Sequence, residues 1–463
     1  MTIRSWLVSR ERWLPALAGV AWWITFYPGF FGDDSLISLT EAQSGAISVW
    51  FTAWWVYLVD ALSLGTRAIP LLTLAGVLTL EYAAFLWVAA VFPKGPARAV
   101  TVLVMSCTPL IGAMGIQVTH DVAATAGLLL CAAVATLAWT SGDRLTPLDY
   151  ATLVLAMPLI ATRHNGMPTV AATAAGLLLV SGARRWRPSA ALIAVAAGTA
   201  VISYGATRAA GHAESVHPAQ TVEWLIGDIS CLLAKEGVEA TVEEWSTLAR
   251  IAGRSDWPQE RACRVMNPIL LAPSFDATAV GANYRDLIGV WLSLGARYPA
   301  RMASAHASRV RLFLPPFVTG ISDGLRVGFL HSTILPNDFG LRWQFPALAT
   351  RARNAVRAWN ALGFILANAA VWLIVLVITA WRLPDYRNRL TPTIVMAVML
   401  ILGLLVAAPI SEGRYGLFIL ICGQATAVFH LVTWRSRDLA NSNHQITRSP
   451  HHQITKSSVN DHS

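Results

Sequence analysis

Long apolar runs separated by short polar segments dominate the chain. A membrane-spanning helix needs about 20 predominantly apolar residues. Candidate spans lie at roughly 13–31, 67–92, 99–117, 121–140, 148–162, 166–182, 189–206, 357–381, 391–410 and 415–434. The pattern predicts an all-α polytopic membrane protein with about ten transmembrane helices.

An eleventh apolar run, residues 46–64, is rich in tryptophan and carries Asp60. Such a segment can lie in the membrane interface instead of crossing. If it does, nearly every short basic loop falls on one side of the membrane, including those with Lys94, Arg185 and Arg387. The positive-inside rule makes that side cytoplasmic. Ten spans with cytoplasmic N- and C-termini is therefore the favoured topology.

This topology divides the chain into four regions. They are an N-terminal transmembrane module of about seven spans at 1–206, with an acidic first external loop at 32–66, an external loop region with amphipathic helices at 207–356, C-terminal transmembrane helices at 357–434, and a disordered cytoplasmic tail at 435–463. Within the external loop, the arginines of residues 285–318 suggest a basic amphipathic segment on the outer leaflet.

Composition supports a membrane protein, because 55% of residues are hydrophobic and only 13% are charged. Soluble domains are about a quarter charged. The net charge of +9 fits cytoplasmic loops and lipid headgroup contacts, so it does not indicate a nucleic-acid partner. The first apolar run lacks an A-x-A-like cleavage site, which favours a retained anchor.

Two of the five cysteines, Cys231 and Cys263, lie in the long polar segment. They suggest a disulfide if that segment lies outside the cytoplasm.

The predicted topology places the short polar clusters together on the external face. The first is Asp33-Asp34, directly after the first apolar run. One carboxylate is a candidate general base for an acceptor hydroxyl, and the other would orient it or hold a divalent cation. The alternative is a solvated loop that ends the first helix.

Two further clusters stand at predicted helix starts. His120-Asp121 opens the fourth span, where Asp121 is either the helix N-cap or a second acid facing the same cavity. Arg163-His164-Asn165 precedes the sixth span. Free backbone N–H groups, an arginine and a histidine favour phosphate binding there. The alternative is an arginine that extends to lipid headgroups.

The remaining candidates are Glu412, Arg414 and Tyr415 at the start of the last span, which are either site residues or interface anchors. Glu81 lies mid-span, where an acid is a candidate proton relay. The chain has no P-loop, Rossmann glycine pattern, C-x-x-C or H-E-x-x-H. Nucleotide-driven transport and zinc chemistry therefore find no support.

The layout resembles the GT-C superfamily of integral-membrane glycosyltransferases, which use polyprenyl-phosphate-linked sugars. The resemblance rests on an acidic loop after the first span, a second acid after the third, and a large late external loop. It is most specific to an uncharacterised bacterial branch, through YPGFFGDDSLISLTEAQSG, THDVAA, RHNG and the EWLIGDIS region. One family feature is absent, because VWFTAWW lacks a D-x-hydrophobic-Pro step.

The resemblance implies sugar transfer from a polyprenyl phosphate to a cell-envelope glycan, lipid or protein at the outer face of the bacterial cytoplasmic membrane. Asp33 or Asp34 would be the base, and Asp121 the second acid. Some members of the superfamily need a divalent cation, for which these three aspartates are the candidate ligands. The donor phosphate would contact residues among His120, Arg163, His164, Asn165, Glu412, Arg414 and Tyr415.

Three other functions fit parts of the sequence. A transporter or flippase of a lipid-linked or anionic substrate predicts inverted repeats and polar residues throughout the spans. A membrane acyltransferase or polymer ligase would depend on His120, His164 or His331. A purely structural scaffold leaves the one-sided polar clusters unexplained.

Overall fold

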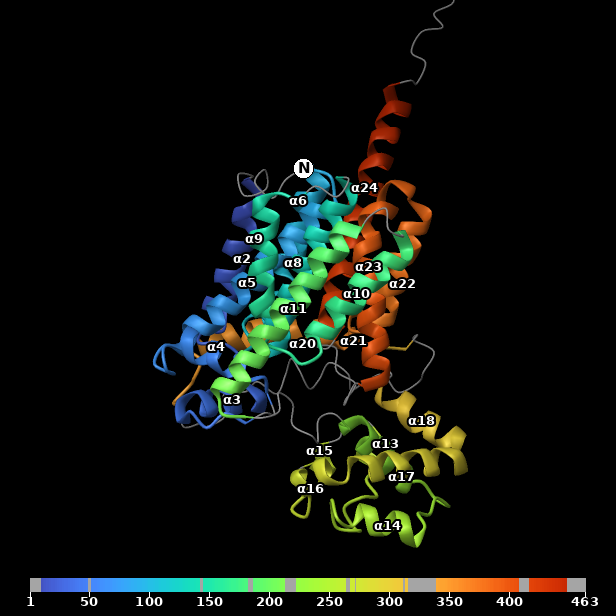
Figure 1. Cartoon of the computed structure of the whole chain (residues 1–463). Coiled ribbons are helices and arrows are strands. Elements are labelled where there is room, and N and C mark those ends of the chain that lie inside the picture. Colours follow the sequence, from blue (N-terminus) through green and yellow to red (C-terminus); the bar gives the residue numbers. More distant parts are fainter. Residues whose placement is uncertain are drawn as a thin grey trace, which may run out of the picture.

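The computed structural model describes residues 10–48, 51–141, 145–181, 186–212, 222–263, 267–270, 272–310, 313–314, 339–407 and 416–447. Within these ranges the regular structure is helical (Figure 1), and the single bridge outside helices joins Phe30 to Gln117. The predicted all-α class is confirmed.

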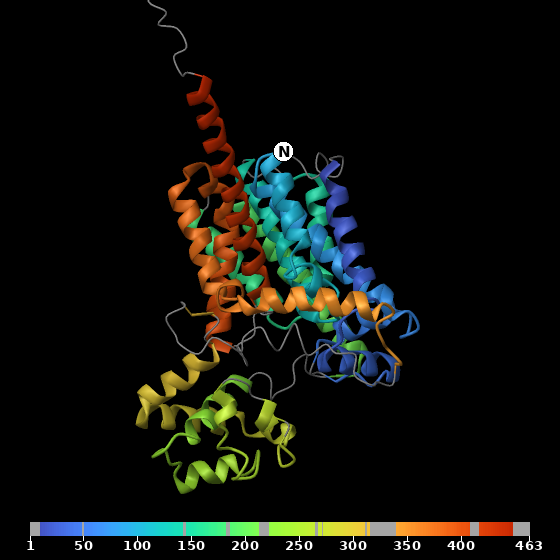
Figure 2. The same cartoon turned by 180° about the vertical axis from the view of Figure 1, so that it is seen from behind.

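Ten apolar helices of the described chain form one bundle (Figures 1 and 2). Five are long and apolar enough to cross a membrane, namely α5 (Ile69–Val91), α8 (His120–Thr140), α11 (Trp186–Ala209), α23 (Pro384–Ala407) and α24 (Leu417–Thr447). Five are shorter, namely α2 (Trp13–Thr25), α6 (Pro96–Cys107), α9 (Pro147–Ile160), α10 (Gly166–Ser181) and α22 (Ala369–Arg382). Each matches one predicted apolar run, so the prediction of a multi-pass membrane protein is confirmed.

The centre of the bundle is α8, which is almost completely buried. Helices α5, α9 and α23 pack against it. Its sequence, HDVAATAGLLLCAAVATLAWT, is rich in alanine, and small side chains let helix backbones approach closely within a membrane. At Gly127 a Cβ would lie 2.6 Å from Ile160 of α9, which shows how close that approach is.

Three predicted boundaries change. The run 99–117 is not one helix, because α6 ends at Cys107, just before Thr108-Pro109, and a short α7 (Gly112–Gly115) follows. A residue preceding proline is disfavoured in the α conformation. Within the run 357–381, the apolar helix α22 begins only at Ala369. Helix α24 continues past residue 435 to Thr447, where a disordered tail was expected, and no proline or glycine interrupts that stretch.

The helices alternate in direction, so one end of the bundle collects the ends of α2, α9, α11 and α23 and the starts of α5, α8, α10, α22 and α24 (Figure 1). We call this end the lower rim. The start of α2 and the end of α24 lie at the opposite end, beside the predicted cytoplasmic loops. The external orientation of the lower rim is the prediction of the positive-inside rule.

Two short helices, α3 (Asp33–Ser44) and α4 (Ala53–Ser63), lie at the lower rim. Helix α4 lies within the eleventh apolar run, and its interfacial position stays a prediction. Trp54 Nε1 donates to the carbonyl of Pro158 at 2.7 Å, and Thr52 Oγ1 donates to that of Thr162 at 3.0 Å. These bonds attach α4 to the end of α9.

Below the rim, the described part of residues 222–310 forms a helical unit with its own apolar core. We call it the external unit, after the orientation that the positive-inside rule predicts. Its helices are α13 (Glu223–Leu233), α14 (Val242–Leu248), η3 (Glu260–Cys263), α15 (Asn267–Leu270), α16 (Ala277–Ala282), α17 (Tyr284–Arg297) and α18 (Pro299–Arg309). Trp257 is completely buried in this core. Cys231 and Cys263 form a disulfide that joins α13 to η3.

The arginines of α17 and α18 do not form the basic lipid-facing surface that the sequence suggested. Arg297 pairs with Glu244, and Arg301 Nη1 donates to the carbonyl of Glu236 at 2.6 Å. Arg309 is fully buried and pairs with Asp228 at 2.6 Å. These three arginines therefore bind partners inside the unit. Arg311 lies outside the described residues.

Close backbone contact between α5 and α7 holds the segment that leads to the start of α8. A Cβ at Gly76 would lie 2.7 Å from the carbonyl oxygen of Gly115. Gly76→Ala should therefore destabilise the bundle by about 1–3 kcal/mol, measured as a lower thermal unfolding temperature in detergent. Gly403→Ala in α23 is the control, because no atom lies within 4 Å of its added Cβ. Equal unfolding temperatures for the two variants would contradict this packing.

Candidate active site

The structure brings three of the predicted polar clusters to the lower rim. The loop after α2 runs beside the segment before α8, where Phe30 N donates to the carbonyl of Ile116 at 3.1 Å and Val118 N donates to that of Phe30 at 3.2 Å. Ser35 Oγ then donates to the carbonyl of Val118 at 2.6 Å. These bonds place the start of α3 next to the start of α8.

Asp33 and Asp34 are the first two residues of α3, so they begin a helix instead of forming a solvated loop that ends one. Gly32 precedes them in extended conformation, and its N–H donates to Ser35 Oγ at 3.1 Å. Negative charge is favourable in the first turn of a helix. The side chain of Asp34 is partly exposed, and that of Asp33 lies outside the described side chains.

Asp121 is fully buried and forms an ion pair with Arg163, whose side chain is largely buried as well. Thr119 Oγ1 donates to Asp121 Oδ2 at 3.3 Å, and His120 Nε2 lies 3.7 Å from Asp121 Oδ1. The N-cap of α8 is Thr119, not Asp121 as one interpretation of the sequence had it. Asp121 therefore holds Arg163 in place across the start of α8.

Aromatic rings surround His120. The ring of Phe51 lies 5.5 Å from the imidazole, and that of Trp55 lies 6.3 Å from it. The carbonyl of His120 accepts from Thr162 Oγ1 at 3.1 Å. The imidazole thus lies beside Phe51 and Trp55 at the start of α4, and the backbone of His120 is bonded to the turn that carries Arg163.

His164 and Asn165 are partly exposed and directly precede α10, which begins at Gly166. Helix starts carry free N–H groups and a partial positive charge, so they attract phosphate. The structure therefore groups Arg163, His164 and the start of α10 at one corner of the rim, with Asp121 as the carboxylate partner of Arg163. We call it the electropositive corner, after its arginine, its histidine and the helix start.

One predicted cluster lies outside the described chain, and one predicted acid lies away from this site. Glu412, Arg414 and Tyr415 lie outside the described chain. Glu81 is buried within α5 in a small cavity shared with Ser106. It lies about 18 Å along the helix from the lower rim.

Glu223, the first residue of α13, is a candidate that sequence reasoning missed. Burial raises the pKa of its carboxyl to about 7, the positive charge of Arg309 opposes that shift, and the negative charge of Asp34 adds to it. Glu223 and Asp34 are therefore close enough for their charges to interact. In the sequence, Glu223 is only an acid at the start of a predicted helix, so its interaction with Asp34 could not be predicted.

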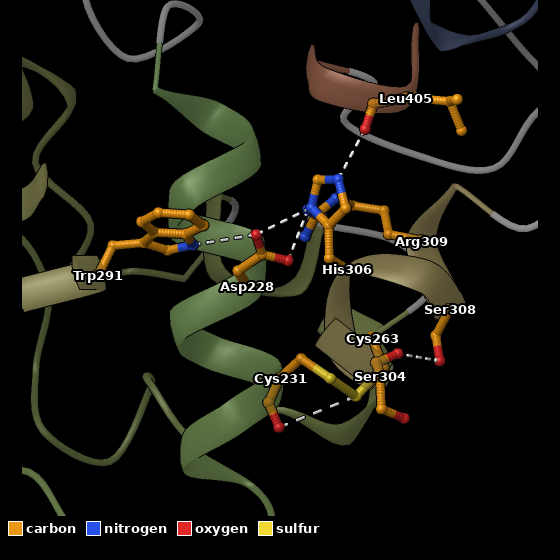
Figure 3. A network of polar contacts seen from close by, with 9 residues as sticks. All are labelled: Asp228, Cys231, Cys263, Trp291, Ser304, His306, Ser308, Arg309 and Leu405. Atoms are coloured by element: carbon orange, nitrogen blue, oxygen red, sulfur yellow. Dashed lines mark hydrogen bonds and ion pairs between the residues drawn. A yellow bond between two sulfur atoms is a disulfide. The ribbon is translucent and has the colours of Figure 1, made fainter. Parts of the chain in front are cut away.

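A second polar network centres on Asp228, which is fully buried in α13 (Figure 3). Arg309 Nη2 lies 2.6 Å from Asp228 Oδ1, and Trp291 Nε1 donates to Oδ2 at 3.1 Å. His306 Nδ1 lies 3.1 Å from the same Oδ2, and its Nε2 lies 2.6 Å from the carbonyl of Leu405. Because Leu405 belongs to α23, His306 joins the external unit to the bundle.

The described residues do not form a ready cation site. No group of three His, Cys, Asp or Glu suited to a metal ion occurs among the described residues. The buried charge of Asp121 is already compensated by Arg163. Asp121 is therefore a poor ligand for a divalent cation shared with Asp33 and Asp34.

No family model and no curated protein matches the chain. Among solved structures, the chain is similar to ArnT from Cupriavidus metallidurans, crystallised bound to undecaprenyl phosphate. The identity is 15%, the TM-score is 0.35, and the match covers 92% of this chain and 78% of that chain.

The docking of the external unit should depend on pH. Hydrogen bonding to Asp228, together with its charge and the Leu405 carbonyl, raises the pKa of His306 above its usual 6.5. A raised histidine pKa adds stability that is complete below pH 6.5 and disappears as pH rises through the raised value. Thermal unfolding of wild type and His306→Gln should therefore differ most below pH 6.5 and converge in alkaline solution. An equal difference from pH 5 to pH 9 would contradict this role.

Proposed function

We propose that the protein is a membrane glycosyltransferase. It moves a sugar from a polyprenyl-phosphate-linked donor to an acceptor hydroxyl at the lower rim, on the external face of the membrane. The proposal rests on one observation. The start of α3, which bears Asp33 and Asp34, lies next to the start of α8, and Asp121 of α8 pairs with Arg163 of the electropositive corner. The resemblance of these motifs to the GT-C superfamily supports the same reaction.

The position at the rim suits a lipid-linked donor. Its hydrocarbon chain occupies the membrane, so its phosphate lies at headgroup depth, level with the ends of the spanning helices. Arg163, His164 and the start of α10 are grouped at that depth. Such fixed positive groups stabilise the charge that develops on a departing phosphate.

The chemistry requires a base on the acceptor side. Asp33 or Asp34 accepts the proton of the acceptor hydroxyl as its oxygen attacks the anomeric carbon. The bond between that carbon and the phosphate oxygen breaks, and its electron pair leaves with the polyprenyl phosphate. Asp121 serves as a positioning residue, because it is fully buried and paired with Arg163.

Replacing the proposed base should abolish transfer. In membranes supplied with labelled polyprenyl-phosphate sugars, Asp33→Asn or Asp34→Asn should lower the rate by about 10²–10⁴-fold, the usual contribution of a general base. Asp286→Asn, an exposed carboxylate of the external unit, is the control. Full activity in both single variants and in the double variant would disprove the mechanism. Loss of activity in His120 or His164 variants, with full activity in both aspartate variants, would favour an acyltransferase or ligase.

Variants of the Asp121–Arg163 pair distinguish an effect on stability from an effect on activity. Arg163→Gln leaves a buried carboxylate unpaired, which should cost about 3–5 kcal/mol of folding free energy. Adding Asp121→Asn removes that charge, so the double variant should regain stability without regaining transfer. Thermal unfolding and label transfer on the same preparations measure the two effects. Recovery of activity together with stability would show that Arg163 has only a structural role.

A further inference from the structure

Helix α20 (Pro346–Ala361) lies along the lower rim, across the ends of the spanning helices (Figure 2). The segment that precedes α20 is held at the end of α2, where Gln344 N donates to the carbonyl of Tyr27 at 3.1 Å. Beyond it, α21 (Gly363–Leu366) leads to the start of α22. Both ends of α20 are thus held at helix ends of the same rim, about 24 Å apart for a helix of this length.

One face of α20 is packed on the bundle. Ala349 and Val356 are fully buried, and Ala352 and Trp359 pack beside them against the main core. The spacing of these four positions marks a single helical face. The remaining faces are directed away from that contact.

Arg353 and Arg357 stand one turn apart beside the buried face, and Arg353 is partly buried. Burial and the positive charge of Arg357 lower the pKa of Arg353. Within the described chain, neither guanidinium has an ion pair or hydrogen bond. Residues 339–384 contain no aspartate or glutamate. Two adjacent positive charges therefore lack a local carboxylate, unlike Arg297 and Arg309 of the unit below the rim.

Large apolar side chains are exposed around the same helix. Leu348 is 47% exposed and Leu362 is 55% exposed, and Phe345 and Ile365 are similar. An apolar surface next to unpaired arginines, on a helix lying in the plane of the rim, is typical of helices at the boundary between headgroups and acyl chains. The exposed leucines suit acyl chains, and the arginines suit phosphates.

We propose that Arg353 and Arg357 bind the phosphodiester headgroups of anionic bilayer lipids, so that α20 anchors the lower rim in the membrane interface. The surface supplies two positive charges at headgroup depth, and the lipid supplies the negative charges that the described chain does not. This role is independent of sugar transfer, and it goes beyond the proposed function.

Native mass spectrometry of the full-length protein in detergent tests the proposal, with phosphatidylglycerol, phosphatidylcholine, polyprenyl phosphate and inorganic phosphate as separate probes. Each arginine near a membrane surface strengthens anionic lipid binding by about fivefold. The double variant Arg353→Gln/Arg357→Gln should therefore bind phosphatidylglycerol about 25-fold more weakly, with phosphatidylcholine binding unchanged. The charge-matched control is Arg254→Gln/Arg285→Gln in the external unit.

Unchanged phosphatidylglycerol binding in the double variant would overturn the proposal. A loss confined to polyprenyl phosphate would also overturn it, because the arginines would then serve the donor. Equal competition by inorganic phosphate would indicate a general anion site and would contradict a lipid surface. Arg353→Lys/Arg357→Lys, which keeps both charges, should retain most of the binding and separates loss of charge from loss of folding.

Discussion

The buried ion pair between Asp121 and Arg163 is the constraint on which the rim of this protein depends. A carboxylate without solvent exposure requires a positive partner, and Arg163 supplies it from the turn between α9 and α10. That pairing fixes the start of α8 against the start of α10. Thr52 Oγ1 donates a hydrogen bond to the carbonyl of Thr162, and Thr162 Oγ1 donates one to the carbonyl of His120. These two bonds attach α4 to the same junction. The other elements of the candidate site are arranged around this centre.

The external unit completes the arrangement from below. It carries Glu223 to within electrostatic range of Asp34, although the two residues belong to distant parts of the chain. The Asp228–His306–Arg309 network attaches it to the end of α23. The bundle therefore supplies the electropositive corner and the first carboxylates, while the external unit supplies a further acid whose pKa lies near neutrality. This division is consistent with a lipid-linked donor held in the membrane and an acceptor that approaches from outside it.

Much of the bundle was predictable, because the length of an apolar run is a local property of the sequence. The rim was less predictable. The packed face of α20 is built mostly from small side chains, Ala349, Ala352 and Val356, so it did not stand out in the sequence. Pro109 divided a run that composition alone left continuous. The clustering of Asp33-Asp34, His120-Asp121 and Arg163 on one side followed from charge bias. Their individual partners did not, because the contacts of Arg163, Glu223 and Arg309 join residues far apart in sequence.

The proposed function requires the donor phosphate to bind at the electropositive corner of the lower rim. A cryo-electron-microscopy map of the full-length protein in lipid nanodiscs with added polyprenyl phosphate tests this requirement. Phosphate density is expected beside Arg163, His164 and the start of α10, near the start of α3. Phosphate density at the opposite end of the bundle, or on a path through its interior, would disprove the proposed site and favour a transporter.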